Sequence, residues 1–271
     1  MSFGPLLDAS WLRDSLGEPD LRVVDCRWKL GQPGFGHAAY LEGHIPGAAF
    51  LDLDTDLSDP PGERGRHPLP DPARFEQAAR GSGISGNSRV IAYDEAGEGG
   101  AARLWWLLRH FGHDAVAVLD GGLAAWRDQD GPLEADVHEP PAGDFTARER
   151  TGDTADAEEI ERGGLALVDA RAPERYAGET EPMDPAAGHI PGARNVPFAQ
   201  VAPGGRYLDS KELRARLARE DGGEIVAYCG SGVSACTVVL AAEVAGVPAR
   251  LYPGSWSEWC VRAGAIETGS R

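Results

Sequence analysis

The sequence predicts an α/β protein with two consecutive domains, each a parallel sheet flanked by helices on both faces. Two observations predict it. Four motifs recur in the same order in the two halves of the 271-residue chain. In addition, each half alternates short apolar runs with helical patterns. A chain of this length suits one large domain or two of ordinary size, and the recurring motifs favour two.

Four pairs of similar segments carry the internal duplication. The pairs are 21–27 with 165–171, 43–48 with 188–193, 90–94 with 225–229, and 119–122 with 252–255. An order shared by four pairs is hard to obtain by chance, and the spacing is too long for a solenoid repeat. We therefore expect domains at residues 1–135 and 153–271, joined by a polar, proline-rich linker at 136–152.

Short apolar runs indicate strands buried on both faces, as in the centre of a parallel sheet. In the first half these runs are 23–26, 90–93 and 115–119. Helical patterns lie at 101–111 in the first half, and at 210–220 and 234–245 in the second. Such alternation is typical of a parallel sheet covered by helices.

The motif Gly-His-Ile-Pro-Gly-Ala occurs in both halves, at 43–48 and at 188–193. Glycine and proline favour tight turns. Because only the second half is expected to be catalytic, we interpret the motif as structural.

Composition excludes several classes of function. The formal charge of −17 argues against nucleic acid and anionic membrane surfaces as partners, since both require clustered positive charge. The first residues lack the pattern of a signal peptide, and no apolar stretch is long enough to span a bilayer. The four cysteines show no metal-binding spacing. We therefore expect a reducing compartment, the cytoplasm, with Cys26, Cys236 and Cys260 in structural roles.

Cys229 is the candidate nucleophile. It follows the apolar run 225–228 and precedes a loop of small residues and a helix. Ligand sites of open α/β sheets lie at the carboxyl ends of strands. Gly230 and Gly232 allow backbone N–H groups to converge, and a helix start adds partial positive charge. Both favour the thiolate, the reactive form of cysteine. The alternative is a buried cysteine beside an ordinary turn.

The matching loop of the first half has no nucleophile. Asp94 stands where Cys229 stands in the second half, and Glu95 and Glu98 lie beside it. A loop lined by carboxylates disfavours an anion, so we expect the first half to be inactive.

Together these motifs resemble the tandem-domain rhodanese family, over nearly the whole chain. The loop from Cys229 to Ala235, Cys-Gly-Ser-Gly-Val-Ser-Ala, is similar to that of the 3-mercaptopyruvate sulfurtransferase branch. Thiosulfate enzymes of the family typically have basic residues in this loop. Thiosulfate carries two negative charges and benefits from cations in the loop. The mercaptopyruvate carboxylate carries one and can be held by a cation further away.

The resemblance implies a sulfurtransferase that needs no cofactor. Cys229 would take sulfane sulfur from a small-molecule donor, 3-mercaptopyruvate, and pass it to a thiol acceptor such as thioredoxin, or to cyanide. A relay of Asp54, His67 and Ser231 across the domain interface would assist. The implied substrate-binding residues are Arg175, Gly230, Gly232, Val233 and Ser234.

The sequence departs from the family at one point, and three other readings stay open. A second arginine is usual about nine residues after Arg175, but the stretch from Glu179 to Asp184 has none. The donor could instead be thiosulfate. A cysteine phosphatase would need an arginine six residues after Cys229, where Ala235 stands. A rhodanese module that only binds partners would be expected to have lost the nucleophile.

Overall fold

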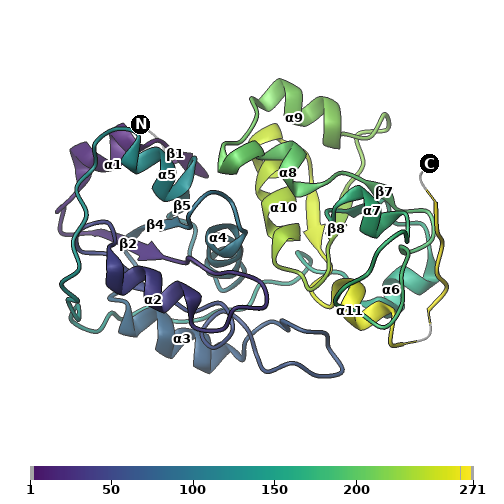
Figure 1. Cartoon of the computed structure of the whole chain (residues 1–271), viewed down its shortest axis with the longest axis horizontal. Helices are drawn as coiled ribbons and strands as arrows, with labels where there is room; N and C mark the ends of the chain where they lie inside the picture. The colour runs from purple at the N-terminus through teal and green to yellow at the C-terminus, as the bar shows by residue number, and fades with distance from the viewer. Residues whose placement is uncertain (1–2, 263, 270–271) are drawn as a thin grey trace. The chain divides into compact units, whose positions relative to one another are not determined.

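The chain divides into two compact units in the computed structural model, which describes residues 3–262 and 264–269. The first unit contains residues 3–59, 70–150 and 204–206. The second contains residues 60–69, 151–203 and 207 onward (Figure 1). The short segment 60–69 therefore belongs to the second unit, although it lies within the first half of the sequence.

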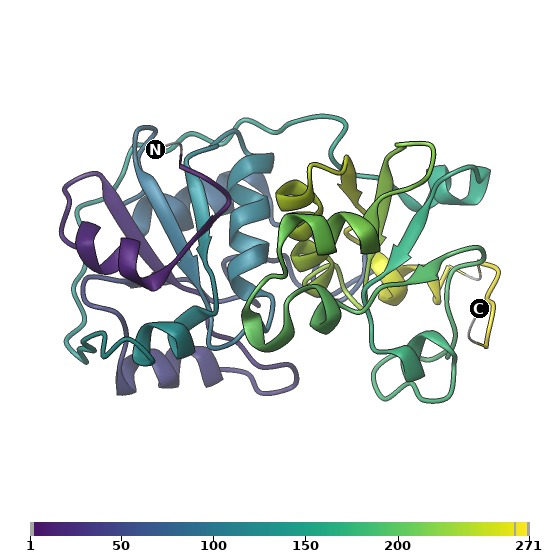
Figure 2. The same ribbon diagram turned by 90° about the horizontal axis from the view of Figure 1, so that it is seen from above.

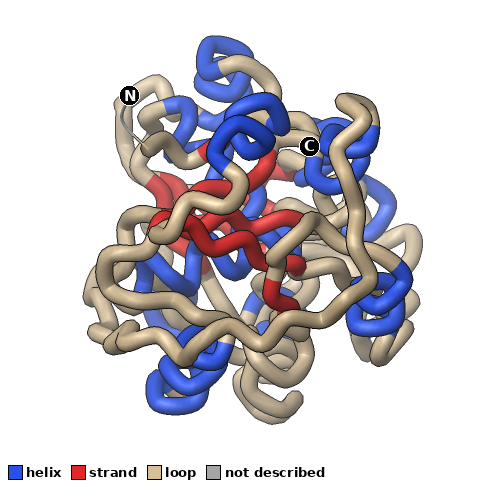
Figure 3. The backbone as a smooth tube through the Cα atoms, turned by 90° about the vertical axis from the view of Figure 1, so that its left-hand side faces the viewer, coloured by secondary structure: helices blue, strands red, loops and turns tan. Residues whose placement is uncertain are grey.

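The first unit is built on a five-stranded sheet in which every paired strand is parallel. Its order is β1 (Leu6–Leu7), β5 (Val116–Leu119), β4 (Arg89–Tyr93), β2 (Leu21–Asp25) and β3 (Ala49–Phe50). The helices are α1 (Ala9–Ser15), α2 (Phe35–Glu42), α3 (Pro72–Gly81), α4 (Gly100–His110) and α5 (Gly122–Arg127). Helices lie on both sides of the strands (Figure 3).

The second unit repeats this plan with a four-stranded parallel sheet. Its order is β7 (Arg194–Asn195), β6 (Leu167–Asp169), β8 (Ile225–Tyr228) and β9 (Ala249–Leu251). The helices are α6 (Ala157–Arg162), α7 (Pro173–Tyr176), α8 (Phe198–Val201), α9 (Ser210–Leu217), α10 (Ser234–Ala245) and α11 (Ser255–Trp259). Both α8 and α9 pack against α10 (Figure 1, Figure 2). A parallel bridge between Thr154 and Leu251 takes the place of the β1–β5 pair.

The predicted fold class is confirmed, and most predicted elements begin and end within two residues of the observed ones. The helix expected over 210–220 is an exception, because α9 ends at Leu217. Its last carbonyl groups are capped from outside the helix. The Arg194 guanidinium donates to the carbonyl oxygens of Arg216 and Leu217, which satisfies the helix end and lets the chain turn away. No helix among residues 3–262 and 264–269 is long and apolar enough to cross a membrane.

Residues 136–150 form no helix or strand, yet part of this stretch is anchored to the first unit. The Phe145 ring is buried and lies edge-on to Phe75, with 5.9 Å between ring centroids. The backbone N–H groups of Arg148 and Arg150 donate to the carbonyl oxygens of Phe111 and His110. The domain limits expected from the sequence remain a prediction.

The Gly-His-Ile-Pro-Gly-Ala motif makes the same contacts in both units. His44 Nδ1 donates to the carbonyl oxygen of Tyr40 at 2.8 Å, and His189 Nδ1 donates to that of Tyr176 at 2.8 Å. Each imidazole stacks on the same tyrosine, with centroids 3.9 and 3.8 Å apart. These buried contacts fix a turn, as expected for a structural motif.

A buried ion pair joins the end of a central strand to this turn in each unit. Arg27 pairs with Asp25, and Arg171 pairs with Asp169 at 2.6 Å. All four side chains are 2% exposed or less. The same guanidinium also donates to the carbonyl oxygen that precedes the motif histidine, which for Arg171 is that of Gly188, at 2.6 Å.

We predict that Asp169→Asn destabilises the second unit by about 3–5 kcal/mol, because the buried Arg171 loses the closer of its two counter-charges. Urea unfolding followed by circular dichroism measures the change. Asp221→Asn is the matched control, because Asp221 pairs with Arg219 on the surface, where ion pairs contribute little. Equal losses of stability in the two variants would contradict the prediction.

Candidate active site

Cys229 lies directly after β8, which is a central strand of the second sheet. The residue is buried, with 2% of its surface exposed. Its Sγ accepts a hydrogen bond from the backbone N–H of Gly232 at 3.2 Å. A backbone donor aimed at the sulfur stabilises negative charge on it. The predicted place at the carboxyl end of a strand is where the structure has this cysteine.

The loop after Cys229 requires glycine at position 232. Gly232 has a φ of 79°, which disfavours side chains. A Cβ atom there would also lie 2.3 Å from the carbonyl oxygen of Pro253. Val233 precedes α10 as its N-cap, and Ser234 is the first residue of that helix.

Helix α11 fixes the loop from the other side. The N–H of Trp256 donates to the Cys229 carbonyl oxygen at 3.0 Å, and that of Ser257 donates to Gly230 at 2.9 Å. The first unit has the same two bonds, from Leu123 to Asp94 and from Ala124 to Glu95. The two loops therefore share one scaffold.

Ser255 holds the Cys229 backbone in place and is itself in a strained conformation. Its Oγ accepts the Cys229 N–H at 3.1 Å and donates to the Tyr252 carbonyl oxygen at 2.9 Å. Its φ is 53°, and among the described non-glycine residues only Asp130 shares a positive φ. The equivalent residue of the first unit is Gly122, with a φ of 57°. A serine in a glycine's conformation stores strain at this site.

The loop of the first unit holds a carboxylate of its own. Asp94 accepts hydrogen bonds from the backbone N–H groups of Gly97 at 2.7 Å, Gly99 at 3.1 Å and Ala101 at 3.3 Å. Burial nevertheless raises the pKa of Asp94. Burial, with Asp94 nearby, also raises the pKa of Glu98 to about 7. The N–H donors of this loop are thus occupied by a carboxyl group of the loop itself.

Two residues of the predicted relay are in contact. His67 Nδ1 lies 2.7 Å from Ser231 Oγ, and both residues are mostly buried. His67 belongs to the segment 60–69 of the second unit. Asp54 belongs to the first unit, where its Oδ1 accepts a hydrogen bond from Trp28 Nε1 at 3.2 Å. Its pairing with His67 stays a prediction.

Arg175 lies beside the Cys229 loop but is already paired. A methyl group on Gly230 would be 3.3 Å from Arg175 Nη1. Arg175 Nη2 donates to Glu181 at 2.7 Å and to Asp184 at 3.4 Å. The carboxylate-binding role of Arg175 stays a prediction.

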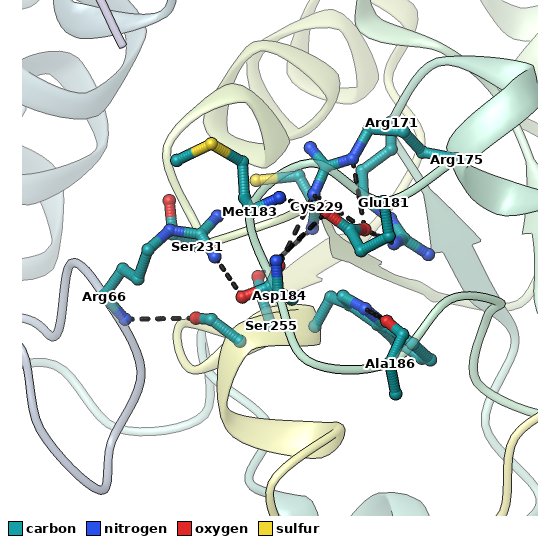
Figure 4. A network of polar contacts seen from close by, with 12 residues as sticks. Arg66, Arg171, Arg175, Glu181, Met183, Asp184, Ala186, Cys229, Ser231 and Ser255 are labelled. Carbon is teal, nitrogen blue, oxygen red and sulfur yellow. Dashed lines mark hydrogen bonds and ion pairs between the residues drawn. The ribbon is translucent and has the colours of Figure 1, made fainter. Parts of the chain in front are cut away.

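A chain of alternating charges links the core to this loop (Figure 4). Arg171 reaches Glu181 at 3.3 Å, and Glu181 holds Arg175. Asp184 contacts both Arg175 and Arg66. The Arg171 guanidinium also lies over the Trp256 ring, 4.6 Å from its centroid.

Four residues of this site were not predicted from the sequence: Arg66, Glu181, Asp184 and Ser255. One signal was available for Ser255, since it replaces a glycine in the repeat alignment. Arg66 precedes His67, but sequence alone does not give the direction of its side chain. The other three cysteines form no disulfide among the described residues, and burial raises the pKa of Cys26 and Cys260.

A cavity of about 500 Å³ lies elsewhere in the second unit. Its lining includes Leu167, the first residue of β6, together with Arg194 and Asp221. The start of β6 is at the opposite edge of the parallel sheet from the carboxyl end of β8. The cavity is therefore separate from Cys229. No group of side chains suited to a metal ion occurs in the described parts of the chain.

Comparison with known proteins identifies two copies of one domain. The family described as Rhodanese-like domain matches residues 8–129 and 155–262. A Pseudomonas aeruginosa protein with the provisional name 3-mercaptopyruvate sulfurtransferase is 46% identical over 272 residues, 96% of each chain. A Mycobacterium tuberculosis protein with the provisional name thiosulfate sulfurtransferase is 45% identical over 255 residues, 90% of this chain and 88% of its own. The crystal structure of the Escherichia coli 3-mercaptopyruvate sulfotransferase aligns with a TM-score of 0.82 at 36% identity, covering 94% of this chain and all of that one.

We predict that Ser255→Ala destabilises the second unit by about 1–3 kcal/mol, since it leaves the buried Cys229 N–H and Tyr252 carbonyl without this partner. Ser255→Gly loses the same bonds but relieves the strain, so it should be less destabilised than Ser255→Ala by about 1 kcal/mol. Chemical denaturation of both variants measures the difference. Asp130→Gly, which relieves strain alone at the other positive φ, is the control. A glycine variant less stable than the alanine variant would contradict the role of strain.

Proposed function

The chain belongs to the rhodanese family, and from this we propose that it moves sulfane sulfur from 3-mercaptopyruvate to an acceptor through a persulfide on Cys229. It is an enzyme of the sulfurtransferase class, which uses a sulfur donor and a sulfur acceptor. The observation that carries the proposal is the environment of the Cys229 thiol. It is fixed at a strand end, with the Gly232 N–H donating to its sulfur.

In the first half-reaction, the Cys229 thiolate attacks the sulfur atom of 3-mercaptopyruvate. A sulfur–sulfur bond forms while the carbon–sulfur bond breaks, and the electron pair of the broken bond leaves on carbon as the enolate of pyruvate. The enolate then takes a proton and becomes pyruvate. Cys229 retains the sulfur as a persulfide, which is covalent catalysis by one side chain.

The contact between Ser231 and His67 supports a source for that proton. A serine hydroxyl is a weak acid by itself. When His67 Nδ1–H donates to Ser231 Oγ, the hydroxyl proton is directed to the substrate and the developing negative charge is stabilised. Asp54 is proposed to orient His67, by the logic of serine-hydrolase triads.

In the second half-reaction, an acceptor takes the outer sulfur and the Cys229 thiolate leaves. The acceptor is proposed to be a thiol, such as that of thioredoxin, or cyanide. Neither step requires a metal or an organic cofactor.

The four cysteines take part in no disulfide among the described residues, which supports a reducing compartment, the cytoplasm.

Thiosulfate is the second candidate donor. The name of the Mycobacterium tuberculosis relative points to it. Ala235 is buried in α10, at the position where a phosphatase loop would need arginine, so a cysteine phosphatase is disfavoured.

We predict that Cys229 alone carries the transferred sulfur. Incubation with 3-mercaptopyruvate should add one sulfur atom to the wild-type protein, and none to Cys229→Ser, in intact mass spectrometry. Cys236→Ser is the control, since Cys236 is buried in the first turn of α10, and it should retain the added sulfur. A persulfide that survives in Cys229→Ser would falsify the assignment.

We also predict that alanine substitutions of Ser231 and His67 slow the turnover of the two donors to different extents. Ser231→Ala or His67→Ala should slow 3-mercaptopyruvate turnover by about 10²–10⁴, the usual size of general acid–base assistance. Thiosulfate turnover should change much less, because sulfite leaves as a stable anion that needs no proton. Steady-state kcat for both donors measures the effect. Equal losses with both donors would indicate a structural role for the loop.

A further inference from the structure

Arg66 lies beside the nucleophile loop, although it comes from a distant part of the sequence. Its segment, 60–69, belongs to the second unit. The Arg66 N–H donates to Ser257 Oγ at 3.0 Å, and the Ser257 N–H donates to the Gly230 carbonyl oxygen at 2.9 Å. One serine of α11 thus connects the Arg66 backbone to the loop that follows Cys229.

The guanidinium groups of Arg66 and Arg175 face the same spot. A methyl group on Gly230 would lie 2.9 Å from Arg66 Nη2 and 3.3 Å from Arg175 Nη1. Gly230 is the residue directly after Cys229. Two cations therefore lie close to the residue that follows Cys229 (Figure 4).

Asp184 occupies both guanidinium groups in the resting protein. Its Oδ1 pairs with Arg66 Nη1, and its Oδ2 lies 3.4 Å from Arg175 Nη2. The Asp184 side chain is 4% exposed, whereas that of Arg66 is 22% exposed. Arg66 Nε is buried and has no hydrogen-bond partner among the described residues. The Asp184 carboxylate is thus shared by two guanidinium groups, while the buried Arg66 Nε is available to another acceptor.

We propose that Arg66 is a donor-binding residue that grips the donor's anionic group together with Arg175, and that Asp184 competes with the donor for both. This inference rests on the proposed sulfurtransferase function. Arg66, which directly precedes His67, then supplies the second guanidinium group that the stretch from Glu179 to Asp184 lacks.

The local charges then determine donor selectivity. Arg66 and Arg175 are balanced by Glu181 and Asp184, which lie in direct contact with them. A balanced site accepts a monoanion such as 3-mercaptopyruvate more readily than the thiosulfate dianion, because the dianion brings more negative charge without a counter-charge. Removing the charge of Asp184 should favour both donors, and thiosulfate more.

The test compares KM and kcat of four variants with 3-mercaptopyruvate and with thiosulfate. Arg66→Ala should raise KM for 3-mercaptopyruvate about tenfold or more, as expected when a charge-assisted hydrogen bond is lost, while kcat changes little. Arg66→Lys should recover part of the loss. Asp184→Asn should lower KM, and should raise the ratio of thiosulfate to 3-mercaptopyruvate kcat/KM several-fold. Such a gain cannot result from misfolding.

Arg64→Ala is the matched control, since Arg64 is an exposed arginine of the same segment. It should leave both KM values unchanged. An unchanged KM in Arg66→Ala, an equal rise in Arg64→Ala, or no change in Asp184→Asn would overturn the inference. Intact mass after incubation with each donor separates the two levels. A wild-type protein that gains no sulfur from either donor refutes the proposed function, whereas one that gains it with an Arg66-independent KM refutes only this inference.

Discussion

The buried pair of Asp169 and Arg171 is the interaction on which the geometry of the second unit depends. It joins the end of β6 to the turn at Gly188 and places the guanidinium group over Trp256 in α11. Arg171 then reaches Glu181, which holds Arg175. Each charge is positioned by the one before it, so the order of the core extends to the nucleophile loop. Buried charges are costly unless each has a partner, and Asp169, Arg171 and Glu181 each have one.

The two copies show what must change to convert one scaffold into two kinds of loop. In the first unit Arg27 approaches Glu95 at 3.8 Å, and Glu95 pairs with Arg127 at the end of α5. Asp94 uses the backbone donors that a ligand would need. In the second unit the smaller sulfur atom of Cys229 takes the equivalent place, and a serine replaces the glycine behind it. The strand order and the motif turns stay the same.

The fold was predictable because its signals are local. Apolar runs such as 90–93, helical patterns and repeated turns each depend on a few neighbouring residues. The position of Cys229 at a strand end was predictable for the same reason, since a strand, a glycine loop and a helix follow one another in the sequence around it. Arg66 and Asp184 were not, because their contact joins residues 118 positions apart. The sequence shows that residues 179–184 contain no arginine. Only the tertiary structure shows that the guanidinium group of Arg66 lies beside this stretch, paired with Asp184.

The segment 60–69 makes the second unit depend on the first half of the sequence. By contacts it belongs to the second unit, while residues 204–206 belong to the first. Each unit thus includes a short piece of chain encoded in the other half of the sequence. A gene fragment starting at residue 151 would encode Cys229 without Arg66 or His67. The first half of the sequence therefore cannot be deleted without removing residues 60–69 of the second unit.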